Sequence, residues 1–277
     1  TYVQANEFFT ARCHRVSSPK NTGDAKQKPL SKGDLLHGMK VLDLANMVAG
    51  PAVSHHLAEY GAEVIAAAPP SSDHFPPYLM AAMLMLQQGK QSILIDVKTV
   101  PGREIFNKLV SWADVVVHNI LDDTAGRLGV THEQLKEINP NVVSCQVSAY
   151  GGSWRGGWET LQGVEPTAQA ICGVMTQYGS LEVPQEHGRV ACTDIPAGFS
   201  GAFAVLLGVY QKQKTGYGGE ARTALARTAN YVQLPWMIAE NGGSDWGEAR
   251  GQFAVGEHGW QRLYACCDGW IYVGTTE

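Results

Sequence analysis

The sequence has 277 residues, of which 44% are hydrophobic and 17% are charged, a balance typical of a folded globular protein. Its net charge is −5 at pH 7, so no basic field predicts a nucleic-acid partner or an anionic membrane. No apolar run approaches the roughly 20 residues that a membrane-spanning helix requires, and the N-terminal residues lack the pattern of a signal peptide. We therefore expect no nucleic acid and no membrane among its partners.

Six cysteines occur in the chain, and no two of them have the C-x-x-C spacing. They are Cys13, Cys145, Cys172, Cys192, Cys266 and Cys267. Adjacent cysteines suit neither zinc nor an unstrained disulfide, and the pair His55 and His56 has no partner at i+4. We expect reduced thiols, no metal and a cytoplasmic location.

The first regular element begins near residue 39. Residues 17–34 are polar and lysine-rich and contain proline and glycine, which favours a linker. We predict an N-terminal extension and linker over 1–36, a large α/β domain over 37–240, and a glycine-rich loop with the start of a truncated small domain over 241–277.

Strands and helices then alternate along the chain. Short apolar strands are predicted over 39–45, 62–68, 91–97, 114–120 and 142–151. Helices lie between them: one from Pro51 to a stop at Gly61, one opened by Pro101, and one that a Thr131/Gln134 capping box begins. This alternation predicts a doubly wound, Rossmann-like parallel sheet, in which ligands bind at the carboxyl ends of strands.

The later part of the chain has a different pattern. A long helix rich in small residues is predicted over 195–213, and a second helix over 221–240. Residues 262–277 read as a hairpin, for which Asp268-Gly269 is the turn signal. We take this hairpin as the beginning of the smaller second domain.

Nicotinamide dinucleotide binding is not expected, in spite of the fold class. The turn after the first strand would need G-x-G-x-x-G, so that the backbone can approach a pyrophosphate, but it reads ANMVAGPA with Gly50 alone. No phosphate-binding G-x-x-x-x-G-K-[ST] sequence and no G-x-S-x-G elbow occurs either.

A series of segments, in order from Gly38 to Val273, resembles the family III (CaiB/BaiF-type) CoA-transferases. They read GMKVLDLANMVAGP, YGAEVI, GKQSILIDVKTVPGREIFNKLV, ADVVVHNI, RLGVTHEQLKEINPNVVSCQVSAYG, the Asp194 segment, KTGYGG and CDGWIYV. The resemblance implies coenzyme A or acyl-CoA as substrate, small carboxylic acids as the other partners, and an interlocked homodimer or a fused second half.

The resemblance also assigns the chemistry to Asp194, in ACTDIPAGFSG. In this family an aspartate attacks an acyl-CoA thioester and then carries CoA as an aspartyl thioester. Asp194 precedes a helix, whose N-terminus stabilises anions, and the small residues that follow it would admit a bulky thioester. The alternative is an ordinary N-cap. Glu165 matches a second acidic position of the pocket, or is simply a surface residue or the start of a helix before Pro166.

For CoA, the resemblance points to residues at strand ends and one helix further on. These are Val48, Ala49, Lys90, Gln91, His118, Asn119 and Arg127. The glycine-rich segments 150–158 and 241–247 would frame the pocket and shield the intermediate. The sequence departs from the family pattern where cations are usual: residues 66–69 read AAAP, a second basic residue is replaced by Gln91, and the turn after the fourth strand reads ILDDT.

Three alternatives stay open beside a CoA-transferase. An acyl-CoA racemase would need a histidine where Val164 stands. A catalytically degenerate half would complete a dimer or a fused partner, which the lost cations favour and Asp194 opposes. A CoA-dependent lyase of the same superfamily is the third.

Overall fold

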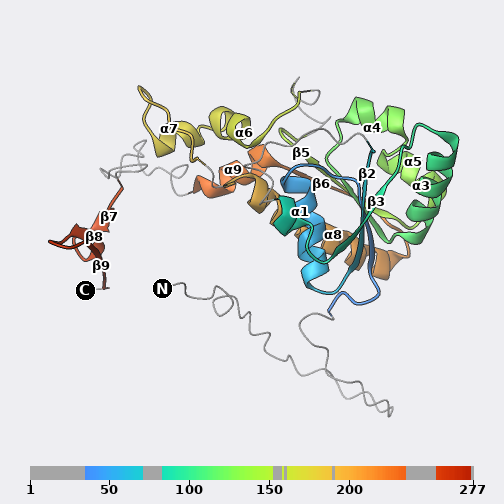
Figure 1. The fold of residues 1–277 in the computed structure, drawn as a ribbon, viewed down its shortest axis with the longest axis horizontal. Coiled ribbons are helices and arrows are strands. Elements are labelled where there is room, and N and C mark those ends of the chain that lie inside the picture. Colours follow the sequence, from blue (N-terminus) through green and yellow to red (C-terminus); the bar gives the residue numbers. More distant parts are fainter. Residues whose placement is uncertain are drawn as a thin grey trace, which may run out of the picture. The chain divides into compact units, whose positions relative to one another are not determined.

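A computed structural model describes residues 35–70, 83–151, 158, 161–188, 191–234 and 254–275. The predicted linker over 17–34, the glycine-rich loop 241–247 and most of the loop 150–158 lie outside the described residues. The described part contains a six-stranded α/β unit and a separate three-stranded sheet (Figure 1).

The larger sheet has the strand order β3-β2-β1-β4-β5-β6, and every neighbouring pair is parallel. Its strands are β1 (Lys40–Asp43), β2 (Glu63–Ala68), β3 (Lys90–Leu94), β4 (Val115–His118), β5 (Val143–Ser148) and β6 (Glu220–Ala224). The chain reverses its direction of winding between β1 and β4, which is where open α/β sheets bind ligands. The predicted fold class is confirmed.

Helices cover both faces of this sheet (Figure 1). Residues of α1 (Ala49–Glu59) and α8 (Asp194–Thr215) share one core with the sheet. Residues of α3 (Val100–Trp112), α4 (Asp122–Leu128) and α5 (His132–Ile138) share a second core on the opposite face. The consecutive valines of β4 divide between these cores, Val115 and Val117 facing one and Val116 the other, because side chains alternate along a strand.

Local sequence signals account for several helix ends. The Thr131 hydroxyl and the Gln134 side chain form the predicted capping box at the start of α5. Thr99 caps α3 by accepting from the amide of Gly102, with Pro101 in the first turn. Gly61 follows α1 with φ 96°, so the predicted stop is confirmed.

The helices α1 and α8 pack closely because glycines stand at their contact. A Cβ on Gly198 would overlap the Cβ of Ala52, and one on Gly201 would overlap the side chain of Val53. These small residues therefore bring α8 against α1, and the expectation that they make room for a thioester is wrong for these two.

One predicted element was wrong. Residues 221–240 were expected to be helical, but 220–224 form β6, and α9 (Leu225–Val232) begins only after it. The sequence EARTA consists mostly of good helix formers, so pairing with β5 overrides local propensity. Two further helices, α6 (Glu165–Ile171) and α7 (Val174–Tyr178), precede α8. A helix start at Glu165 was one of the alternatives for that residue, whereas α7 was not predicted.

The smaller sheet contains β7 (Gly256–His258), β8 (Gln261–Ala265) and β9 (Trp270–Gly274), all antiparallel. The strands β8 and β9 form the predicted hairpin, and the amide of Cys266 donates to the carbonyl of Gly269 across its turn. The strand β7 was not predicted.

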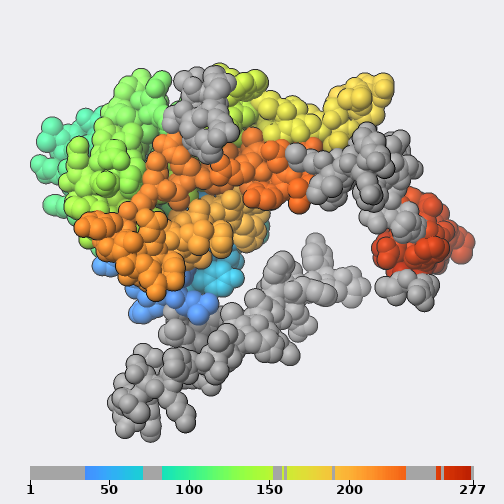
Figure 2. Space-filling model, turned by 180° about the vertical axis from the view of Figure 1, so that it is seen from behind, coloured from blue at the N-terminus to red at the C-terminus, as the bar shows by residue number. Residues whose placement is uncertain are grey.

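The outer face of α8 carries an apolar stripe. Its exposed members recur at helical spacing: Phe199, Phe203, Leu206, Leu207 and Tyr210. Figure 2 views the molecule from behind, where the residues from α8 to α9 lie at the surface in light orange to orange. Within the part of the chain that the structure describes, no helix is both long enough and apolar enough to cross a membrane.

Candidate active site

The helix α8 begins at Asp194, and a carboxylate from another helix satisfies its first amides. The N-cap residue Thr193 makes no side-chain cap within the described part. Glu165, at the start of α6, accepts instead from the backbone N–H groups of Thr193 and Asp194. These are donors that a helix cannot satisfy internally. Asp194 is therefore the first residue of the helix, and the N-cap alternative for its side chain is wrong.

The Glu165 carboxylate is surrounded by donors. Its Oε1 and Oε2 lie 2.9 and 3.0 Å from the amide nitrogen of Thr193, and Oε2 lies 2.6 Å from that of Asp194. The Thr193 hydroxyl donates to Oε2 at 2.7 Å, Nε2 of Gln169 donates to Oε1 at 2.8 Å, and the Cys192 thiol donates to Oε1 at 3.3 Å. A carboxylate has about four lone-pair sites, so these contacts leave little capacity for a substrate proton.

Burial, with a smaller contribution from the nearby Glu165 charge, raises the pKa of Asp194 from 3.8 to about 7. Burial and the same charge also raise the pKa of the Cys192 thiol to about 12, so the thiol keeps its proton and stays a donor. Strongly perturbed pKa values cluster at functional sites, so the Asp194 carboxyl group is a candidate for one.

The Asp194 carboxyl itself makes no hydrogen bond to any of the described residues. Glu165, by contrast, has both oxygens occupied. The two acids thus differ in chemical capacity: one is fixed by donors, and the other stands half-buried at the positive end of a 22-residue helix. This arrangement suits a carboxylate nucleophile held beside a fixed anion.

The residues around this pair were only partly found from sequence. Thr193 is fully buried, and its carbonyl accepts from the Thr228 hydroxyl of α9 at 2.9 Å. Gln169 is also fully buried. Its spacing of four from Glu165 on one helix was the available signal.

At the switch point of the sheet, the loops after β1 and β4 are tied together. Asn119 Oδ1 accepts from the amide of Asn46 at 2.9 Å, and Asn119 Nδ2 donates to the Asn46 carbonyl at 2.6 Å. The expected CoA-binding residues Val48 and Ala49 are buried at the start of α1. A Cβ on Gly50 would overlap that of Ala45, so the glycine allows α1 to begin close to β1.

Lys90, one of the expected CoA-binding residues, has partners within the protein. Its ammonium donates to Asp43 Oδ2 at 2.9 Å and to the Pro51 carbonyl at 2.8 Å, and both charged side chains are 1% exposed. Asp43 also accepts from the Ser54 hydroxyl and the Ala45 amide. Burial lowers the pKa of Lys90, and the Asp43 charge opposes that shift. In this structure the group joins β1, β3 and α1.

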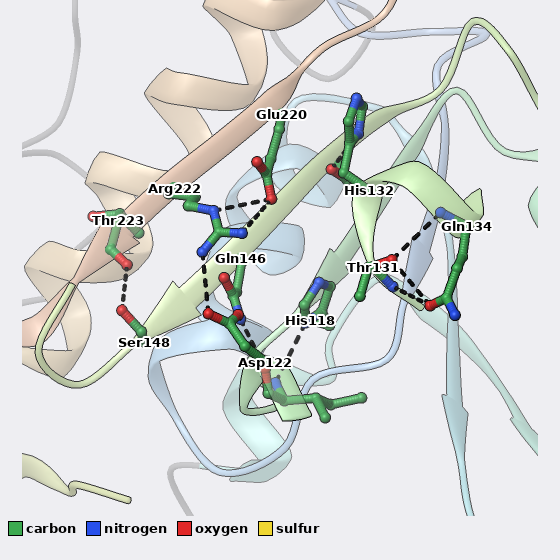
Figure 3. Close-up of polar contacts among 12 residues, drawn as sticks. His118, Asp122, Thr131, His132, Gln134, Gln146, Ser148, Glu220, Arg222 and Thr223 are labelled. Atoms are coloured by element: carbon green, nitrogen blue, oxygen red, sulfur yellow. Dashed lines mark hydrogen bonds and ion pairs between the residues drawn. The ribbon is translucent and has the colours of Figure 1, made fainter. Parts of the chain in front are cut away.

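His118 lies in a polar row on the α4 face of the sheet (Figure 3). It aligns with Gln146 of β5, which aligns with Arg222 of β6, and Asp122 accepts from both of these neighbours. Burial, then the Arg222 charge, lowers the pKa of His118 to about 4. The side chain is 3% exposed, and its Nδ1 accepts from the amide of Ile120 at 3.4 Å.

The other expected CoA contacts are at the surface. Gln91 is exposed on the edge strand β3, and Arg127 is exposed on α4, where it donates to the Thr124 hydroxyl at 2.8 Å. Asp194 and Glu165 are thus brought into direct contact, whereas the expected CoA residues divide between buried and exposed positions.

Comparison with protein families decides the relationship. The model of CoA-transferase family III matches residues 36–277. The chain belongs to CoA-transferase family III.

Two named relatives illustrate the range of this family. The chain is 33% identical to the CoA-transferase/lyase DddD of Marinomonas sp. (strain MWYL1), over 95% of this chain and 31% of that protein. It is 27% identical to the human succinyl-CoA:glutarate CoA-transferase, over 86% of this chain and 56% of the relative. The chain therefore spans less than two thirds of the length of these family III proteins.

Solved structures agree with the family and the fold. A CAIB/BAIF family protein from Brucella suis superimposes with a TM-score of 0.72 at 27% identity, covering 86% of this chain and 65% of that one. A second structure, from Mycobacterium tuberculosis, gives a TM-score of 0.68 at 26% identity, covering 85% of this chain and 63% of the other.

Proposed function

We propose that this protein moves coenzyme A between carboxylic acids through an aspartyl-CoA thioester on Asp194. The observation that carries the proposal is the contact between Asp194 and Glu165 at the start of α8. Asp194 has a carboxyl group free of hydrogen bonds to the described residues, an environment that perturbs its pKa, and a helix N-terminus beneath it.

The reaction balances without a redox partner or a net proton. An oxygen of the Asp194 carboxylate attacks the carbonyl carbon of the acyl-CoA, the C–S bond breaks, and a mixed anhydride and the CoA thiolate result. The thiolate then attacks the aspartyl carbonyl and releases the donor acid as its carboxylate. The acceptor carboxylate repeats these two steps in reverse order, which forms the new acyl-CoA and regenerates Asp194.

Glu165 acts in this proposal as a fixed anion and not as a proton carrier. Its two oxygens accept hydrogen bonds from Thr193, Gln169, Cys192 and the amide of Asp194. These donors fix the orientation of the carboxylate. It holds the backbone of the nucleophile, and its charge raises the proton affinity of Asp194.

We propose that fewer residues contact CoA than the sequence implied. The loops after β1 and β4, with Val48, Ala49 and Asn119, form the floor of the switch-point site, and Gln91 and Arg127 are available at the surface. Lys90 and His118 support this floor from within, because both are buried with protein partners. The proposed partner, an interlocked second copy or a fused half, would cover the apolar stripe of α8.

Trapping tests the proposal directly. The protein is incubated with a panel of acyl-CoAs and then with hydroxylamine, and mass spectrometry locates the hydroxamate. We expect it on Asp194, and we expect none in Asp194→Asn. A matched control is Asp123→Asn, which changes an exposed aspartate on α4 and should label normally. No adduct with any donor, together with no CoA binding, would support a degenerate half.

A second candidate is a CoA-dependent lyase. It is favoured by the similarity to DddD, a relative named both transferase and lyase, over 95% of this chain. A transferase conserves every acyl group, whereas a lyase releases a fragment from one, so the same incubations separate the two by the masses of the acyl-CoA products. Exchange of the α-proton without an adduct would indicate a racemase instead, although Val164 stands where that reaction needs a histidine.

A further inference from the structure

Gln169 joins Glu165 to His187, in the segment that precedes α8. It is fully buried on α6, four residues after Glu165. Its Nε2 donates to Glu165 Oε1 at 2.8 Å, and its Oε1 accepts from the backbone amide of His187 at 2.9 Å. No other described residue bridges these two partners through its side chain.

The chemistry of the two partners fixes the orientation of the Gln169 amide. A carboxylate oxygen can only accept, and a backbone N–H can only donate. The NH₂ group must therefore face Glu165 and the carbonyl oxygen must face His187. Turning the amide around would oppose two acceptors at one end and two donors at the other, at a buried position where unmet groups are costly.

The segment held in this way leads to the nucleophile. Residues 179–187 are tied back to α7 by the amides of Gly179 and Gln185, which both donate to the Met175 carbonyl. The contact from His187 to Gln169 then fixes the end of this segment against α6. Cys192, which follows it, donates to the same Glu165 oxygen that Gln169 contacts.

We infer that Gln169 is a positioning residue for the acyl-transfer reaction: it orients the Glu165 carboxylate so that this carboxylate holds the backbone of Asp194. The inference rests on the proposed function. Gln169 touches no reacting atom and acts only through Glu165.

The principal variant is Gln169→Leu, and its matched control is Gln233→Leu. Gln233 is also a buried glutamine, 5% exposed, and its Nε2 donates to the Cys172 and Ala229 carbonyls. Both changes remove a buried amide, so both should lower stability. Only Gln169→Leu should slow hydroxamate formation on Asp194, by on the order of ten- to a hundredfold, with KM for acyl-CoA nearly unchanged. Equal rates in the two folded variants would overturn the inference.

Gln169→Glu supplies a variant that retains the shape of the side chain. A carboxyl group can donate to Glu165 only while it is protonated. Besides Glu165, the titratable groups nearest to this contact are Cys192, Asp194 and His187. The rate of Gln169→Glu, as a fraction of the wild-type rate, should fall between about pH 6 and about pH 9. If the rate of Gln169→Glu relative to the wild type did not depend on pH and equalled that of Gln169→Leu, a hydrogen-bond donor at position 169 would not matter for the reaction.

A readout without catalysis separates this inference from the proposed function. Carbon-13 NMR of labelled aspartate, assigned with Asp194→Asn, gives the pKa of Asp194. We expect about 7 in the wild type and in Gln233→Leu, and a lower value in Gln169→Leu, in which the Glu165 charge is less well placed. An unchanged value in Gln169→Leu would defeat the positioning role. A wild type that shows the shift but forms no adduct would defeat the proposed function alone.

Discussion

The backbone amide of Asp194 donates to the carboxylate of Glu165 at 2.6 Å, while burial and, to a smaller extent, the charge of that carboxylate raise the pKa of the Asp194 side chain. Glu165 therefore attracts the main chain of Asp194 and disfavours ionisation of the Asp194 side chain. The attraction fixes the position of the proposed nucleophile, and burial together with the repulsion sets the pH at which its carboxyl group becomes an anion.

The first prediction concerns the pH dependence of acylation. Attack requires the Asp194 anion, so the rate should rise with pH about a midpoint near 7. Glu165→Gln removes the smaller cause of the shift and leaves burial, so the midpoint should move to lower pH but stay above 3.8. Single-turnover acylation across pH measures this. Glu133→Gln, at an exposed glutamate on α5, should leave the midpoint in place, and an unmoved midpoint in Glu165→Gln would contradict the assignment.

The second prediction concerns stability. The pKa of Asp194 is about 7 in the folded protein and ordinarily 3.8. Between these pH values the folded protein therefore binds more protons than the unfolded chain does. The free energy of unfolding consequently falls as the pH rises from about 4 to about 7. Asp194→Asn lacks this penalty. Above pH 7 its free energy of unfolding, measured by urea denaturation, should exceed that of the wild type by about 2–4 kcal/mol. This difference should vanish near pH 4. A difference that did not depend on pH would count against a raised pKa.

The third prediction concerns the buried ion pair of Lys90 and Asp43. Lys90→Met leaves the Asp43 charge buried without its cation, which should cost about 3–5 kcal/mol in the free energy of unfolding. The double change Lys90→Met and Asp43→Asn should cost less than the single one. The control is Lys136→Met, which removes an exposed pair and should cost less than about 1 kcal/mol. Loss of CoA affinity at undiminished stability would instead support the expected CoA-binding role of Lys90.

The fourth prediction concerns the contact between α1 and α8. Gly198→Ala introduces a methyl group that overlaps Ala52, which should destabilise the protein by about 1–3 kcal/mol and lower the acylation rate by displacing the start of α8. Adding Ala52→Gly should recover part of both losses. Gly126→Ala, on α4 with open space around it, should be neutral or stabilising by up to about 1 kcal/mol. Strictly additive losses in the double variant would exclude the overlap as the cause.

The elements of the sheet up to β5 follow from the sequence because local signals agree with the fold there. The capping box of Thr131 and Gln134 and the apolar run that became β4 are examples. The strand β6 could not be read in the same way. Its residues favour a helix when considered alone, and only the edge of β5 makes them a strand.

The site follows the same division. Asp194 could be named as a candidate because the family resemblance supplied its register, and its helix was predicted from small, apolar residues. The role of Glu165 depends on donors that lie 27–29 residues further along the chain, and that of Lys90 on an aspartate 47 residues before it. Such pairings are set by topology, and no local pattern encodes them.

Glu165 and Asp194 both lie in the single connection that leads from β5, which ends at Ser148, to β6, which begins at Glu220. Their contact closes a loop of 29 residues, whose entropic cost grows only with the logarithm of its length. Local opening of this connection would release the amide protons of Thr193 and Asp194 to solvent while the central strands β1 and β4 stay protected. Hydrogen exchange at these two amides would therefore report, in the ligand-free protein, how much of the time the contact between Glu165 and Asp194 is formed.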